Sequence, residues 1–271
     1  MPALYVVATP VGNLEDITLR AVRILKEVKL IAAEDTRKTR KLLSAYGIKT
    51  PTTSYHEHNK LIKLDYILNC LELEDVALVS DAGMPGISDP GYELISSVIR
   101  HNIPVVPVPG PSALISALVV SGLPTDNFIY LGFPPHKAGE RRRLLKSRAD
   151  EKSSLVIFES PHRLSESLKD MLDILGDRRV AISRELTKIH EEVFRGTLSQ
   201  AIEHFTSPRG EFTLVVAGKR EEAMAGINTD IEKRLRQLRK SGMAAKEAVA
   251  QMAEETSLSR KVLYQAWIKM E

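Results

Sequence analysis

The feature that most constrains the fold is a repeated unit: an apolar run ends in a turn of small residues, and a proline then stands near the start of a helix-like run. Three such turns occupy residues 80–91, 108–112 and 159–163. Short strand-like runs that alternate with helical stretches are typical of sheets with parallel strands. The sequence therefore predicts an α/β fold with mostly parallel sheets.

The alternation extends over the first two thirds of the chain. The predicted strands are 4–8, 30–33, 77–80, 104–108, 128–131, 155–158, 180–183 and 212–217. The predicted helices are 17–28, 59–71, 92–100, 112–120 and 162–175. A cluster of breaker residues at 121–127 indicates a boundary. We expect two α/β domains, 1–120 and 121–220, followed by a small helical domain, 228–271.

Composition limits where such a protein works. A chain of 271 residues, 43% apolar, can bury the cores of two compact units and an appendage. Its single cysteine, Cys70, excludes an internal disulfide and fits a reducing compartment. The first residues lack the basic region of a secretion signal, and no apolar run is long enough to span a bilayer. We predict a cytoplasmic location and no membrane partner.

The turns after the strands are the predicted ligand site. In parallel sheets they gather at the carboxyl ends of the strands, where ligands bind. Asp81 stands at a strand end before its helix and is expected to contact a ligand. Asp89 and Ser160 could serve equally well as helix caps alone or as ligand contacts. Glu34 has the spacing of a ribose-binding acid, but the chain lacks both G-x-G-x-x-G and the phosphate-loop pattern. A nicotinamide or flavin oxidoreductase is therefore improbable.

A metal site is not expected. His56 and His58 flank Glu57, but this triplet lacks a third ligand in a defined context, and a surface loop is the favoured interpretation. The paired acids Glu191-Glu192 and Glu254-Glu255 are interpreted as solvated faces.

Positive charge is placed unevenly. The net charge is +3, and the tail 228–271 alone has nine Lys/Arg against six Asp/Glu. A second basic cluster lies at 137–148 and includes Arg141, Arg142 and Arg143. Such clusters attract phosphate backbones, although a solvated helix face is the more common explanation.

The tail has the pattern of three short helices. Apolar side chains recur at helical spacing in 231–238, 245–252 and 263–270, and Gly242 can end the first helix. Arg260 and Lys261 open the last helix after a tight turn, so the segment resembles a helix-turn-helix. Nucleic-acid contact is favoured over the alternative, a dimerising or capping bundle.

Several long strings resemble the tetrapyrrole-methylase superfamily and, within it, the bacterial 16S ribosomal RNA (cytidine-2′-O)-methyltransferase family. They are 8–18, 33–37, 80–91, 109–113, 132–135, 158–163 and 183–188, and with the helical tail they cover nearly the whole chain. The resemblance implies two α/β domains of tetrapyrrole-methylase type with a ligand cleft between them, a homodimer, and S-adenosylmethionine as cofactor. It also implies that the substrate is 16S rRNA within the small ribosomal subunit.

The resemblance places cofactor contacts in six turns and strand ends. They are Pro10, Ser80, Asp81, Ala82, Gly83, Ser88, Pro109, Gly110, Ser112, Ala113, Phe158, Ser183 and Gly210. A ribose hydroxyl is a poor nucleophile, so we look for a base or a cation that stabilises the alkoxide. Glu159, Glu185 and Lys188 are the candidates, and Arg163 and Arg184 are assigned to phosphate. Arg184 and Glu185 could equally form a buried ion pair.

Two other functions stay open. The superfamily also methylates corrinoid and porphyrin precursors, but such an enzyme would not need the basic helical tail. A transcription regulator could instead sense a ligand in its α/β body and bind DNA through the tail. Methyl incorporation separates that alternative from an enzyme.

Overall fold

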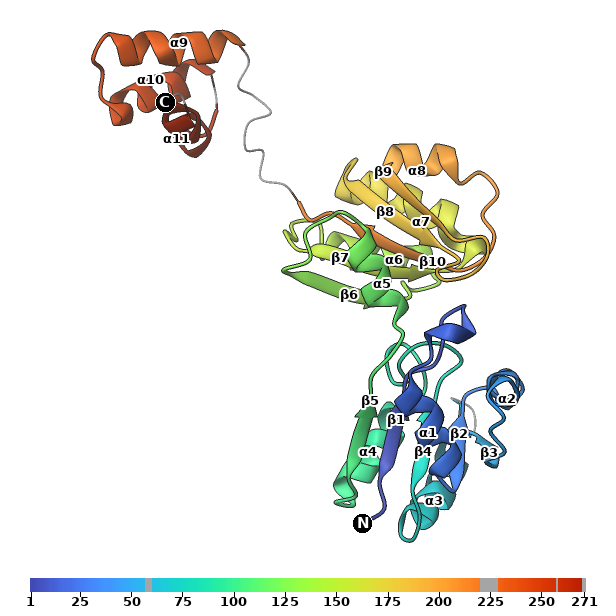
Figure 1. The fold of residues 1–271 in the computed structure, drawn as a ribbon. Coiled ribbons are helices and arrows are strands. Elements are labelled where there is room, and N and C mark those ends of the chain that lie inside the picture. The colour runs from blue at the N-terminus through green and yellow to red at the C-terminus, as the bar shows by residue number, and fades with distance from the viewer. Residues whose placement is uncertain (57–59, 220–228, 257, 270–271) are drawn as a thin grey trace. The chain divides into compact units, whose positions relative to one another are not determined.

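The computed structural model describes residues 1–56, 60–219, 229–256 and 258–269 (Figure 1). They form two compact units, Met1–Gly218 and Lys219–Glu271. The first unit contains two five-stranded sheets, and the second contains three helices. No helix within these ranges is long and apolar enough to cross a bilayer. The two-sheet α/β class and the helical C-terminal part are confirmed.

The first sheet is entirely parallel, in the order β3-β2-β4-β1-β5. Its strands are β1 (Leu4–Val7), β2 (Leu30–Ala33), β3 (Thr52–Ser54), β4 (Val76–Val79) and β5 (Val105–Val108). Its helices are α1 (Leu19–Glu27), α2 (Thr36–Ala45), α3 (Lys60–Leu71) and α4 (Tyr92–Arg100), with a 3-10 turn, η1 (Leu14–Asp16), before α1.

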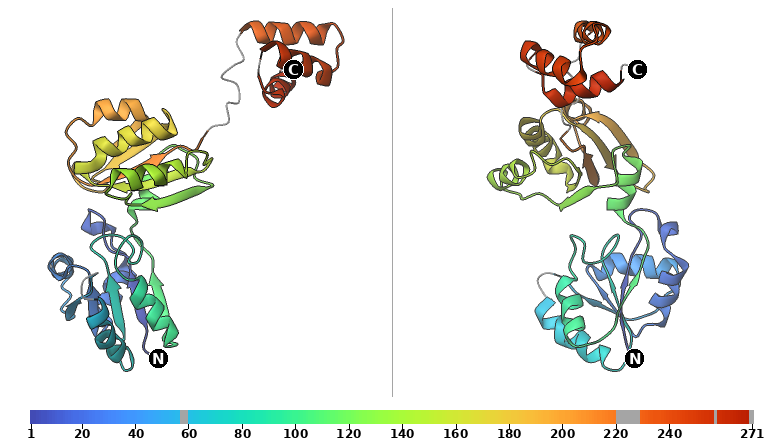
Figure 2. Two further views of the ribbon diagram at one scale, coloured as in Figure 1. Left: turned by 180° about the vertical axis from the view of Figure 1, so that it is seen from behind. Right: turned by 90° about the vertical axis from the view of Figure 1, so that its left-hand side faces the viewer.

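Helices cover both faces of this sheet (Figure 2). The α1 and α2 side chains pack on one face, and those of α3 and α4 pack on the other. Every residue of β2 and β4 is consequently buried, which is the reason that these strands are continuous apolar runs without alternation.

The second sheet corrects the expectation of mostly parallel strands. Its order is β6-β7-β10-β8-β9, and only the β6–β7 pair is parallel. The strands are β6 (Phe128–Gly132), β7 (Ser154–Glu159), β8 (Arg179–Arg184), β9 (Glu192–Thr197) and β10 (Phe212–Val216). The loop between β8 and β9 is too short for a crossover helix, so this pair can only be antiparallel.

The helices of the second sheet also cover both faces. One face carries α6 (Ala138–Lys146), α7 (Pro161–Leu175) and α8 (Leu198–His204). The other carries α5 (Ala113–Val120), whose Ala117 and Leu118 pack with Val156 and Val215. The domain boundary expected at residue 121 stays a prediction, although α5 already packs on the second sheet.

The C-terminal unit consists of α9 (Thr229–Lys240), α10 (Ala245–Thr256) and α11 (Arg260–Lys269) around an apolar core. Gly242 has a φ of 80° just after α9, a conformation that favours glycine and ends the helix as expected. The Arg239 guanidinium lies 5.7 Å from the Trp267 ring centre and donates to the Trp267 carbonyl at 3.2 Å. The predicted start of this domain at residue 228 lies outside the described residues.

Candidate active site

The main cavity, of about 370 Å³, is lined by elements of both sheets. The turn after β4 and the start of α5 contribute one part of its wall. The carboxyl end of β7, the amino end of β10 and the loop before β10 contribute another part. Its volume lies within the range of small-molecule sites, roughly 300–1,000 Å³.

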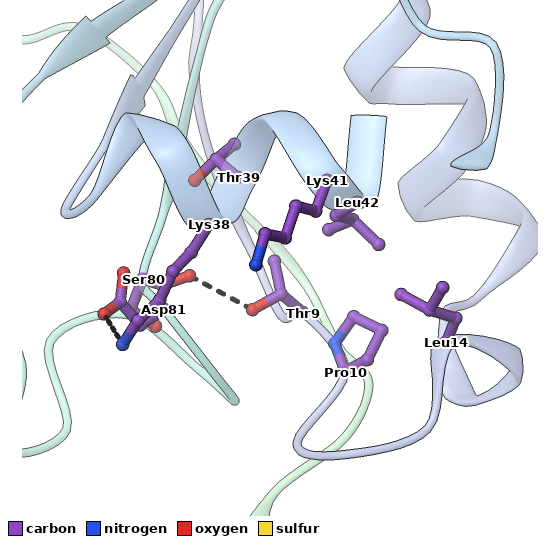
Figure 3. Close-up of a pocket in the computed structure, with 9 residues that line it drawn as sticks. All are labelled: Thr9, Pro10, Leu14, Lys38, Thr39, Lys41, Leu42, Ser80 and Asp81. Atoms are coloured by element: carbon purple, nitrogen blue, oxygen red, sulfur yellow. Dashed lines mark hydrogen bonds and ion pairs between the residues drawn. The ribbon is translucent and has the colours of Figure 1, made fainter. Parts of the chain in front are cut away.

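Most of the predicted cofactor residues line one of two cavities. Those in the main cavity are Asp81, Ala82, Gly83, Ser112, Ala113, Phe158 and Gly210, together with the candidate base Glu159. Pro10 and Ser80 line a smaller neighbouring cavity of about 130 Å³, which Asp81 also borders (Figure 3).

Four predicted cofactor residues line neither cavity. The Ser88 hydroxyl lies 2.6 Å from the Tyr130 hydroxyl. Gly110 packs so closely on the first strand that a Cβ there would lie 3.1 Å from the Ala8 Cβ. Pro109 precedes it in the same turn, and the Ser183 hydroxyl is buried without a hydrogen-bond partner among the described residues. As cofactor contacts, these four stay predictions.

Acidic side chains gather around Asp81. Its Oδ1 accepts from the Asp35 N–H at 3.1 Å, and its Oδ2 accepts from Lys38 Nζ at 2.6 Å. Its own N–H donates to Glu34 Oε2 at 3.1 Å. Asp81 and Glu34 both line the main cavity, and Asp89 lines it as well.

Asp89 is not the helix cap that the sequence allowed, because Gly91 occupies the N-cap of α4. Burial, followed by the negative charge of Glu34, raises the pKa of Asp89 to about 7. Burial is also the main cause of the raised pKa of Glu34. Ser160, in contrast, is the N-cap of α7, with Pro161 in the first turn.

The raised pKa of Asp89 predicts that Asp89→Asn stabilises the protein at pH 8. A folded-state pKa above the unfolded value means that stability falls as pH rises from about 4 through 7. A shift from 3.8 to about 7 corresponds to roughly 4 kcal/mol unscreened, and partial exposure reduces the expected gain to roughly 1–2 kcal/mol. Urea unfolding of both proteins at pH 4.5 and 8 measures it. An equal difference at the two pH values would contradict the assignment.

Glu159 is held on all sides. Its side chain is fully buried at the end of β7, and its Oε1 lies 2.6 Å from Arg163 Nη2. Oε1 also accepts from the Ser160 N–H at 2.8 Å, and Oε2 accepts from the Ser167 hydroxyl at 2.5 Å. Such a carboxylate anchors the turn between β7 and α7, so little of it is available as a base.

Glu185 and Lys188 form an ion pair of 2.9 Å beside the main cavity and do not line it. The hydrogen bond from Lys188 is the main cause of the lowered pKa of Glu185. Burial acts to lower the pKa of Lys188, but the hydrogen bonds to Glu185 and Glu211 outweigh it and raise the pKa. The pair is therefore an ionised carboxylate and a permanent cation.

The loop that carries this pair meets two glycines. A Cβ on Gly12 would lie 2.4 Å from Lys188 Cγ and 2.7 Å from the Leu186 carbonyl oxygen. Gly210 has a φ of 93°, and a Cβ there would lie 2.6 Å from Glu185. Glycine is required at both positions, because the loop after β8 approaches the first turn and the cavity wall closely.

The structure corrects the proposed RNA contact at Arg141. Arg141 is 2% exposed, and its guanidinium bonds Asp170 at 2.7 Å, so it is not available to a phosphate. Arg142 also pairs with Asp170, and with Asp173 at 3.3 Å. Only Arg143 of the three is exposed.

The other predicted RNA contacts differ in availability. Arg163 is held by Glu159 and the Pro134 carbonyl. Arg184 bonds Glu192 at 3.0 Å, so the alternative pairing with Glu185 is not found. Arg260 is exposed, and the Lys261 side chain lies outside the described residues.

Sequence reasoning missed several lining residues. Lys38 and Glu211 line the main cavity, as does Phe133, whose ring centre lies 5.5 Å from that of Phe158. Phe133 belongs to the string 132–135, and Lys38 follows the string 33–37, so closeness to those strings was the available signal. Within the described part of the chain no cluster of His, Cys, Asp or Glu could hold a metal. Glu57 and His58 lie outside the described residues.

Comparison with solved structures defines the class of fold. The first unit's two-sheet architecture resembles diphthine synthase, with a TM-score of 0.66, 12% identity, and coverage of 80% of this chain and 90% of that one. Uroporphyrin-III-C-methyltransferase from Thermus thermophilus gives a TM-score of 0.59 at 21% identity, covering 80% and 94%. Residues 3–202 match the family described as Tetrapyrrole (Corrin/Porphyrin) Methylases.

Curated relatives narrow the family. A protein of Synechocystis named ribosomal RNA small subunit methyltransferase I is 48% identical and covers 100% of this chain and 99% of its own length. One of the same name from Thermotoga maritima is 54% identical, covering 81% of this chain and 100% of the relative. Within the tetrapyrrole methylases, the chain belongs to the ribosomal RNA small subunit methyltransferase I family.

Proposed function

We propose that the protein transfers a methyl group from S-adenosylmethionine to the ribose 2′-hydroxyl of a cytidine in 16S rRNA. The observation that carries the proposal is the main cavity, where turns from both sheets surround acidic and aromatic side chains. The names of the relatives supply the substrate class, since they refer to the RNA of the small ribosomal subunit.

The cavity's chemistry fits S-adenosylmethionine. Asp81, Glu34 and Asp89 offer carboxylates suited to its positive charges, and Phe133 and Phe158 offer apolar ring surface suited to an adenine. Gly83 has a φ of 77°, so the turn after β4 brings backbone, without a side chain, to the cavity wall. When bound, this cofactor would supply an electrophilic methyl group.

The chain's own residues would chiefly align the acceptor hydroxyl and exclude water. The raised pKa of Lys188 keeps this side chain cationic, and we propose that it stabilises the alkoxide that develops as the hydroxyl loses its proton to water, while the new O–CH3 bond forms and the donor's S–CH3 bond breaks to release a thioether. Glu185 would hold Lys188 in place, and Glu159 would fix the cavity wall. Alanine replacement of each, with cofactor affinity measured beside turnover, tests the three roles.

We also propose that the protein acts as a homodimer. Ile115, Val119 and Val120 on α5 are 48%, 66% and 38% exposed, which is unusual for side chains of one short apolar helix. Sedimentation should give a molecular mass twice that of one chain. Val119→Glu should shift the measured mass toward that of a single chain. A monomer at micromolar concentration would contradict this proposal.

Incubation with methyl-labelled S-adenosylmethionine and either 30S particles or free 16S rRNA tests the main proposal. Label should enter one cytidine and be recovered in an alkali-resistant dinucleotide, because a 2′-O-methyl group blocks the adjacent phosphodiester from cleavage. The 50S particle is the control. Label on a base, or on a corrinoid precursor instead of RNA, would contradict the proposal, and a cofactor bound without any transfer would favour the regulator.

A further inference from the structure

Helix α2 is rich in positive charge. Its residues 36–45 include four cations and no acid: Arg37, Lys38, Arg40 and Lys41. Two of the four are neutralised, since Arg37 pairs with Asp35 at 2.8 Å and Lys38 pairs with Asp81 at 2.6 Å. Arg40 and Lys41 are exposed, and neither takes part in an ion pair found in the described part of the chain.

Lys41 borders the smaller cavity of about 130 Å³. The other lining residues lie in the first turn, on α2 and just after β4: Thr9, Pro10, Leu14, Lys38, Thr39, Leu42, Ser80 and Asp81. Figure 3 shows the Lys41 side chain reaching from α2 toward Thr9. The Thr9 hydroxyl donates to the Ser80 carbonyl at 3.2 Å. The cavity thus has room for a small polar group. The Lys41 ammonium at its edge has no ion-pair partner in the described part of the chain.

This cavity adjoins the main one through shared walls. Lys38 and Asp81 line both cavities, so a group bound in the smaller one lies next to the proposed methyl donor site. An anion of the substrate would be oriented there by Lys41, and Arg40, which is exposed one position earlier on α2, would add positive charge nearby. Phosphate contacts of this kind fix the register of a nucleic acid without reading its sequence.

The basic cluster on α6 lines neither of the two cavities. Arg141 and Arg142 are occupied by Asp170, whereas Lys41 borders a cavity.

We propose that the smaller cavity binds a backbone phosphate of the RNA substrate, with Lys41 as its principal ligand and Arg40 beside it. The inference rests on the proposed function and deepens it, because it says where the substrate strand is held during methyl transfer. The carboxylate of the methyl donor is the other anion that could enter, and the experiment separates the two.

The full-length protein is tested as wild type, Lys41→Gln, Arg40→Gln and the double variant. Lys26→Gln is the matched control, because it removes one exposed charge from the last turn of α1. This turn leads into the amino end of β2, whereas the cavity lies at the carboxyl ends of the strands. Affinity for unmodified 16S rRNA and for 30S particles assembled from it is measured from 50 to 300 mM salt, without methyl donor. S-adenosylmethionine affinity is measured by calorimetry, and KM and kcat are measured with labelled donor.

We expect Lys41→Gln to weaken RNA binding and raise the RNA KM about five- to tenfold, with kcat changed less than twofold. The slope of log affinity against log salt should fall by about 0.7–0.9 for each phosphate that the variant no longer neutralises. Arg40→Gln should have a smaller effect in the same direction. Donor affinity should stay within twofold, and Lys26→Gln should match wild type.

Three results would overturn the phosphate site. They are RNA affinity unchanged in the double variant, a donor affinity that falls while RNA affinity holds, or no salt-dependent RNA binding by wild type. The second would show that the cavity takes the donor's carboxylate. If wild type binds RNA through Lys41 but transfers no methyl group, the proposed function fails while the phosphate site stands.

Discussion

Glu159→Ala is expected to lower the free energy of unfolding by about 3 kcal/mol. The substitution removes a fully buried carboxylate that neutralises Arg163, whose side chain is only 14% exposed. It also removes the acceptor for the Ser160 N–H and the Ser167 hydroxyl. A buried cation and two donors would lose their partner. Urea unfolding followed by circular dichroism measures the change.

The double variant Glu159→Ala with Arg163→Met separates the ion pair from the other interactions of Glu159. Much of the stability should return, because most of the cost lies in leaving one charge unpaired. Arg143→Ala, on an exposed face of α6, is the control and should change stability by less than about 0.5 kcal/mol. Unchanged stability of Glu159→Ala with turnover abolished would instead favour a role as base.

Asp81→Asn is expected to weaken S-adenosylmethionine binding about 30-fold, which corresponds to roughly 2 kcal/mol. The carboxylate lines the main cavity and accepts from both Lys38 and the Asp35 N–H. The amide keeps the shape but loses the negative charge beside a cationic ligand and leaves Lys38 without its counter-ion. Calorimetry with the purified chain measures the effect.

Glu211→Gln is the matched control for Asp81→Asn. Glu211 lines the same cavity, but its side chain is 75% exposed and solvent screens its charge. We expect less than a threefold change in donor affinity. Equal effects of the two substitutions would indicate a general dependence on charge instead of a contact at Asp81. Unchanged donor affinity in Asp81→Asn would contradict a role in binding.

How far the site was predictable differs between its parts. The turn 80–91 could be found because a strand followed by small residues ends at the ligand edge of a parallel sheet, and Asp81, Ala82 and Gly83 do line the cavity. Ser88 of the same turn and Gly110 of the next one line neither cavity: Ser88 lies against Tyr130, and Gly110 lies against Ala8. The direction of each side chain depends on the turn's conformation, which the residue types leave open.

The RNA-binding candidates show the same limit for charge. Arg141, Arg142 and Arg143 are adjacent and identical in type, yet they are respectively buried, paired and exposed. The acid that decides this, Asp170, stands on α7, 29 residues from Arg141. Two of the four cations of α2, in contrast, have no counter-ion in the described part of the chain.

The order of residues by itself determined the α/β class, four of the five strands of the parallel sheet and the three-helix tail, because these follow from local periodicity and turn chemistry. Only the tertiary structure decided that β8, β9 and β10 pair antiparallel, that Asp89 lines a cavity, and that the Glu159 carboxylate is bound by Arg163. Strand partners and the neutralisation of charges depend on residues far apart in the chain. Their closeness exists only once the chain is folded.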